Sequence, residues 1–209
     1  INAVEYKVDI SASLTDTDGS EELSNVTIKN IPNGSVLSGE NITDNKDGSY
    51  TVKVDETGKA NLSLTSESEI SQDKLDDVQV SATSTDTPTD GSEAVSNAIS
   101  FAGGGDIDLS NLKDIVNLKE INLENGQKND ITDLKLDDVL DLSTDNKIKI
   151  TGDQFDSVAF KNEDGNGWEL KTENMGKVEG DKTFDVYTNS GDPTVQVKVE
   201  DKISDGITS

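Results

Sequence analysis

The acidic string Asp-Gly-Ser-Glu occurs twice in the first half of the chain, at Asp18–Glu21 and at Asp90–Glu93. Calcium takes about six to eight oxygen ligands, and carboxylates placed around a glycine turn supply several of them together. Asp16, Asp18 and Glu21 have a suitable spacing, with acids at alternate positions followed by a glutamate. The sequence therefore predicts Ca²⁺ as a cofactor. The candidate metal ligands are Asp16, Asp18, Glu21, Asp86, Asp90, Glu93, Asp106 and Asp108.

A solvated turn is the alternative interpretation of each copy, since Asp and Gly favour turns whether or not a metal is bound. The charge of the whole chain favours the metal. With 43 acidic residues against 18 basic ones, the formal net charge is −25, and a compact chain of this charge repels itself. Divalent cations relieve that repulsion. Nucleic acid and anionic lipid need a basic face, so we expect neither as a partner.

The chain contains neither His nor Cys, and every basic residue is Lys. These absences exclude disulfides, Ser-His and Cys-His catalytic pairs, and zinc sites built from Cys or His. A hydrolase with paired carboxylates is an alternative, but carboxylates are so abundant that no single pair is informative. We expect the protein not to be an enzyme.

The first half of the chain predicts a β-sandwich. Hydrophobic residues make up 31% of the chain, against about 45–50% in an average globular protein, so thin sheets fit better than one thick core. From Val4 to Leu14 the apolar residues fall at every second position, as in a half-buried strand. Together with this one, roughly six or seven short strands with turns between them extend to Phe101, which matches an immunoglobulin-like sandwich.

The clearest boundary is Gly103–Gly105, since three consecutive glycines predict a flexible link. We therefore place a sandwich domain at residues 1–102 and a second β-rich domain at residues 103–209. Immunoglobulin-like topology puts the two acidic loops at opposite ends of the sandwich. The first loop would then join Asp106 or Asp108 in a calcium site that stiffens the joint, and the second would serve a joint to a preceding domain.

In the second domain, apolar residues recur at every third position from Leu109 to Ile121. This spacing fits an irregular helix over Asn111–Lys119, or one or two turns of a β-solenoid with Ile121 on a short strand. The segment Leu134–Leu142 is equally ambiguous. The rest predicts mostly antiparallel β-structure with one or two short helices, so the fold class is mainly all-β.

Export and membrane signals are scarce. No apolar stretch approaches the ~20 residues that a membrane helix needs, so we expect no membrane insertion. No N-terminal signal peptide is visible, and the chain starts within a strand pattern at Ile1, as if taken from a longer protein.

Several strings resemble giant bacterial adhesins of the repeats-in-toxin type. In the first half the resemblance is to their immunoglobulin- or cadherin-like repeats, and in the second half to their C-terminal region near the secretion signal. The matching strings are Tyr6-x-Val8-x-Ile10, Asp16–Ser24, Val26-x-Ile28, Ile31-Pro32-x-Gly34, Ile107–Leu112, Ile121–Leu123, Leu136–Leu142, Ile150–Asp153 and Val197–Ile203.

The resemblance implies type I secretion, an extracellular or cell-surface location, folding in external calcium, and a role in attachment or biofilm formation. It implies calcium at Asp16, Asp18 and Glu21, and partners among neighbouring adhesin domains and host or biofilm surface ligands. The glycine-rich nonapeptide repeats of the family are absent apart from Gly103–Asp106. A full calcium β-roll is therefore not expected.

A specific glycan- or peptide-binding domain is the alternative function. Sugar sites stack on exposed aromatic rings, but aromatic residues are only 4% of this chain. Phe160, Trp168 and Tyr187 form the one notable group, and we expect Trp168 to lie in the core.

Overall fold

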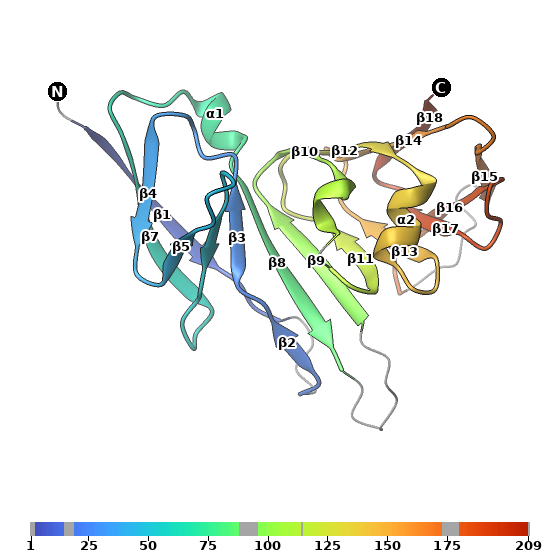
Figure 1. The fold of residues 1–209 in the computed structure, drawn as a ribbon, viewed down its shortest axis with the longest axis horizontal. Coiled ribbons are helices and arrows are strands. Elements are labelled where there is room, and N and C mark those ends of the chain that lie inside the picture. Colours follow the sequence, from blue (N-terminus) through green and yellow to red (C-terminus); the bar gives the residue numbers. More distant parts are fainter. Residues whose placement is uncertain (1–2, 15–18, 88–95, 114, 173–179, 209) are drawn as a thin grey trace.

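The computed structural model describes every residue except 1–2, 15–18, 88–95, 114, 173–179 and 209. The described part is mostly β-strand, so the all-β prediction is confirmed (Figure 1). None of the described helices is both long and apolar enough to span a membrane.

The first half is sandwich-like. A small antiparallel sheet in the order β1-β7-β4 shares one hydrophobic cluster with the β8-β3-β6-β5 part of a larger sheet, and β2 pairs with β8. The alternation from Val4 predicts β1 correctly, because β1 pairs with β7 along its full length. The elements are β1 (Val4–Ser11), β2 (Glu21–Leu23), β3 (Val26–Lys29), β4 (Ser35–Gly39), β5 (Ile42–Asp44), β6 (Tyr50–Val52), β7 (Lys59–Ser66), α1 (Gln72–Asp76) and β8 (Gln79–Asp86).

The second half is a solenoid-like stack of two parallel sheets. The chain alternates between them, so β9, β11, β13 and β17 are parallel neighbours in the larger sheet, and β10, β12, β14 and β18 form the other. The antiparallel strands β16 and β15 extend the larger sheet beyond β17. The elements are β9 (Ser96–Ala102), β10 (Gly105–Ile107), the 3-10 helix η1 (Leu109–Leu112), β11 (Leu118–Asn122), β12 (Asn129–Leu134), α2 (Leu136–Leu142), β13 (Lys147–Thr151), β14 (Ser157–Lys161), β15 (Trp168–Thr172), β16 (Phe184–Asn189), β17 (Gln196–Glu200) and β18 (Ser204–Thr208).

The prediction of mostly antiparallel strands in this half is therefore wrong. Alternation of apolar and polar residues indicates that a strand has one buried face. It does not show whether the neighbouring strand runs parallel or antiparallel. Of the two alternatives for the region from Leu109 to Ile121, the solenoid is correct. Leu109 and Leu112 lie on the short η1, and Ile121 lies on a parallel strand.

In-register columns of apolar residues fill the solenoid. Ile99, Ile121, Ile150 and Val199 are aligned across β9, β11, β13 and β17, and each is at most 3% exposed. On the facing sheet, Ile107, Ile131 and Val158 form a second column. β-Branched residues pack well at such positions, because each strand presents the same face to the interior. The columns therefore fix the register of the coils.

The Gly103–Gly105 segment is hydrogen-bonded rather than a free link. The amide of Gly104 donates a hydrogen bond to the carbonyl of Asp76 at 3.1 Å, and the amide of Gly105 donates to the carbonyl of Lys128 at 2.9 Å. Gly103 has a φ of +82°, and a Cβ there would clash with the carbonyl oxygen of Val78. Glycine is required because the chain turns tightly against β8 on its way from β9 to β10.

Replacing Val158 by Ala tests the columns. Val158 is 1% exposed, so losing its methyl groups leaves a cavity and should lower the free energy of unfolding by about 1.5–3 kcal/mol. Val36→Ala is the matched control, because Val36 is 62% exposed and its truncation should change stability by less than about 0.5 kcal/mol. Urea denaturation measures both variants, and equal losses would contradict the packing described.

Candidate functional site

The two acidic segments meet at one end of β8. Glu21 of β2 lies directly opposite Asp86 of β8 in an antiparallel register, and the amide of Thr87 donates to the carbonyl of Ser20 at 3.1 Å. The prediction that the two segments lie at opposite ends of the sandwich is therefore wrong. The reason is that the chain leaving the first acidic segment folds back as β2 and pairs with the end of β8, where the second segment begins.

Four of the predicted ligands, Asp16, Asp18, Asp90 and Glu93, lie outside the described residues. Asp106 and Asp108 lie near the other end of β8. There the amide of Gly104 donates a hydrogen bond to the carbonyl of Asp76, three residues before β8 begins. Since β8 has 8 residues and a strand rises about 3.3 Å per residue, roughly 25 Å separates the two ends. Figure 1 shows β2 and β10 at opposite ends of the β8–β9 pair. The structure thus does not bring Glu21 together with Asp106 or Asp108.

Asp108 has a local structural role. Its Oδ1 atom accepts a hydrogen bond from the amide of Ser110 at 2.9 Å and so caps η1. Hydrogen bonds from the hydroxyl and amide of Ser110 lower the pKa of the Asp108 carboxyl. Asp106 is exposed and lies in a shallow hollow with Lys74 and Asp77. Within the described ranges, no group of three or more acidic residues is arranged to hold a metal ion. Calcium binding at the eight residues stays a prediction.

The largest feature near Glu21 and Asp86 is a groove of about 540 Å³, here named the junction groove. It runs between the end of β1 and the exposed face of β8, β9 and β11. Small residues form its floor, because Ala82 pairs with Ser100 and Ser84 pairs with Ala98 on the same face of the sheet. The groove also contains three carboxylates from three strands, namely Glu21, Asp86 and Glu120.

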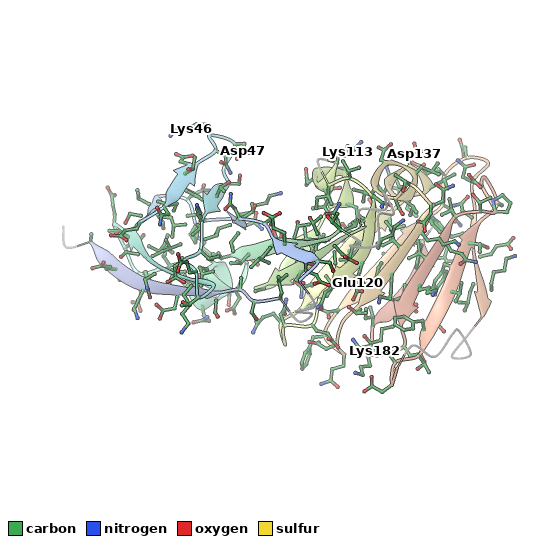
Figure 2. All side chains as sticks on the ribbon, turned by 90° about the horizontal axis from the view of Figure 1, so that it is seen from below. Lys46, Asp47, Lys113, Glu120, Asp137 and Lys182 are labelled. Atoms are coloured by element: carbon green, nitrogen blue, oxygen red, sulfur yellow. The ribbon has the colours of Figure 1, made fainter. Side chains whose placement is uncertain are left out.

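Glu120 is the carboxylate that the solenoid strand β11 contributes to the groove. Its side chain forms an ion pair with Lys149 at 2.6 Å and accepts a hydrogen bond from the hydroxyl of Thr151 at 3.2 Å. Figure 2 shows Glu120 in the middle of the molecule, where the larger sheet passes from the sandwich to the solenoid. The positive charge of Lys149 therefore offsets part of the negative charge that Glu120 brings to the groove.

A second polar site lies at the turns between the two solenoid sheets. Asp156 is 1% exposed and accepts hydrogen bonds from the amide and side chain of Asn129, both at 3.0 Å, and from the amide of Asp153 at 2.7 Å. Burial raises the pKa of the Asp156 carboxyl, although these hydrogen bonds oppose the shift. Asn129, the first residue of β12, is fully buried, and no motif in the sequence indicates its role.

The last coil is fixed by the buried carboxylate of Glu200. This side chain accepts from the amide of Gly152 at 3.2 Å and forms ion pairs with Lys182 at 3.0 Å and Lys202 at 3.2 Å. Lys182 also reaches Glu124 at 2.8 Å. Burial lowers the pKa of Lys182, but its hydrogen bonds to Glu124 and Glu200 outweigh burial and leave that pKa raised. The pairs satisfy a charge that would otherwise be costly to bury.

The aromatic group lies inside the solenoid. Trp168 is 3% exposed, as expected, and its ring centroid is 4.9 Å from that of Phe160. Tyr187 stacks on Phe160 at 4.1 Å. These rings stabilise the core and are not available as a platform for a sugar ring.

Comparisons with known proteins add no identification. No family model matches the chain, and no curated protein or solved structure is significantly similar to it.

Replacing Asp156 by Ala tests the polar site at the turns. The change removes the acceptor of the backbone amides of Asn129 and Asp153, so the free energy of unfolding should fall by about 3 kcal/mol. Asp164→Ala, at an exposed turn, serves as the control and should cost less than about 0.5 kcal/mol. Thermal denaturation followed by circular dichroism compares the two, and a small effect at Asp156 would refute its anchoring role.

The two carboxyls Asp156 and Asp108 should respond to pH in opposite directions. Since folding raises the pKa of Asp156, its contribution to stability is greatest below the unfolded value of about 3.9 and is lost as pH rises through the folded pKa. Since folding lowers the pKa of Asp108, its contribution is present above that value and is lost as pH falls through the folded pKa. Carboxyl ¹³C NMR titration measures both, and an Asp156 midpoint below that of Asp108 would contradict the assignment.

Proposed function

We propose that the chain is a calcium-stabilised, extracellular structural module of a large secreted bacterial adhesin of the repeats-in-toxin type. In this proposal it leaves the cell by type I secretion and supports surface attachment or biofilm formation. The observation that carries the proposal is the meeting of Glu21 and Asp86 on adjacent strands. Like charges placed directly opposite each other in a sheet are destabilising, and a bound cation removes that cost.

The composition supports the same proposal. A net charge of −25 destabilises a compact state through self-repulsion. Extracellular calcium modules typically bind the ion with dissociation constants of about 0.1–1 mM. A module that needs such concentrations would be stable outside the cell and weakened where free calcium is scarce.

Continuity of the larger sheet supports a mechanical role. One hydrogen-bonded strand order runs from β15 through β9 and β8 to β5, and so joins the solenoid to the sandwich. Figure 1 shows the N-terminal end of the chain and the last strand, β18, toward opposite ends of the long axis. A tension applied along that axis would act on paired strands rather than on a flexible link. We therefore propose neighbouring adhesin domains as the principal partners and propose no enzymatic activity.

A binding domain for a glycan or a peptide is the second candidate. The junction groove favours the peptide form, because its described lining offers carboxylates and small residues, and its one aromatic residue, Phe101, is buried in the solenoid cluster.

Calcium should raise the melting temperature of the chain. At about 10 mM calcium and the dissociation constants above, the ion adds about 1.4–2.7 kcal/mol, which corresponds to roughly 3–10 °C for a chain of this size. Differential scanning calorimetry with calcium, with a chelator, and with sodium chloride of equal ionic strength separates binding from screening.

Variants identify the residues involved. Glu21→Gln combined with Asp86→Asn should remove most of the calcium-dependent shift. Glu67→Gln combined with Glu69→Gln, at exposed positions away from the groove, should keep it. If calcium and sodium chloride give the same melting temperature, the calcium proposal fails.

A further inference from the structure

The small sheet of the sandwich has an open edge beside the junction groove. Its strand order is β1-β7-β4, and in the described part of the chain no strand pairs with β1 on the side away from β7. The larger sheet continues past β8 into β9 and β11. Residues from the end of β1 and from β8, β9 and β11 line the groove together. The groove is therefore the place where one more strand would extend the small sheet above β9.

The floor of the groove suits a close approach by another backbone. Ala82, Ser84, Ala98 and Ser100 have short side chains, so a strand seated above them can bury its own side chains without displacing large ones. Strand addition to an open edge gains main-chain hydrogen bonds, and alternate side chains of the added strand enter the groove. A volume of about 540 Å³ holds several side chains of moderate size.

The charge of the groove selects the ligand. Among the residues that the structure describes, its lining contains Glu21, Asp86 and Glu120 and no Lys. Glu120 is paired with Lys149, and Glu21 and Asp86 lie opposite each other on β2 and β8. A segment with Lys or Arg at its groove-facing ends is complementary to this pair, and complementary charges increase both the rate and the specificity of association.

We propose that the junction groove binds an extended, basic peptide segment of a partner protein by strand addition to β1. Small or apolar side chains of the peptide lie on the Ala and Ser floor, and its Lys or Arg side chains reach Glu21 and Asp86. A second copy of this chain is a poor occupant, because each copy carries a net charge of −25. The inference goes beyond the proposed structural role and does not depend on calcium.

Peptide selection on the whole chain tests this inference. A displayed library of random peptides of about a dozen residues is panned against the protein in chelator, and the enriched peptides are synthesised. We expect sequences that alternate apolar and polar positions and carry Lys or Arg. Calorimetry then measures their affinity for the wild-type protein and for three variants.

The variants separate the groove from the rest of the surface. Ser100→Tyr fills the floor at an exposed strand position and should abolish binding. Asp86→Lys reverses a charge opposite Glu21 and should weaken binding about tenfold. Glu40→Lys makes the same change in charge at an exposed turn and should leave affinity unchanged. Circular dichroism and melting curves confirm that each variant is folded.

Other outcomes overturn the inference. It fails if the panning yields no peptide whose binding is lost in Ser100→Tyr, or if Glu40→Lys weakens binding as much as Asp86→Lys does. A dimer in light scattering that Ser100→Tyr converts to a monomer would assign the groove to a second copy instead. None of these results changes the calcium-dependent melting temperature, so failure here is distinguishable from failure of the proposed function.

Discussion

The architecture depends on the two pairings made by β9. This strand is antiparallel to β8 on one side and parallel to β11 on the other. Between β8 and β9 the buried face of the sheet changes. Val80 and Ala82 of β8 pack in the sandwich, whereas Ile99 and Phe101 of β9, which point to the opposite face, pack in the solenoid. The junction groove exists because Ala98 and Ser100 of β9 lie on the face that neither hydrophobic cluster covers. Small residues suit this uncovered face, since large apolar side chains there would form an exposed apolar patch.

The solenoid holds its coils in register by two means. Apolar columns such as Ile121 over Ile150 fill the interior, and they tolerate sliding by two residues with little change in the buried face. The polar turns remove this ambiguity. Asp156 must meet the donors of Asn129, and Glu200 must meet Gly152 and Lys182, because a buried polar group without a partner costs about 1–3 kcal/mol. The turns thus specify the register that the columns stabilise.

Local patterns in the sequence predict the parts of the fold that depend on neighbouring residues. The alternation from Val4 identifies β1, and the expectation that Trp168 lies in the core is confirmed. Strand direction and pairing depend on residues far apart in the sequence, so the parallel sheets and the contact between Glu21 and Asp86 could not be predicted from spacing. The prediction of a flexible link at Gly103–Gly105 is wrong for the same reason. A glycine run predicts freedom of the backbone, but here that freedom is used to fit a hydrogen-bonded turn against β8.

The calcium and peptide proposals both use Glu21 and Asp86, and this has an energetic consequence. A cation bound between the two carboxylates neutralises the charge that attracts a basic peptide, whereas a bound Lys or Arg supplies the positive charge that calcium would otherwise bring. Linkage requires each ligand to weaken the other by the same factor. With exposed carboxylates the effect is modest, since such charge pairs contribute only about 0.2–1 kcal/mol each. The groove would then be most receptive to a basic segment where free calcium is low, and calcium would favour the unliganded, stiffened state of the module.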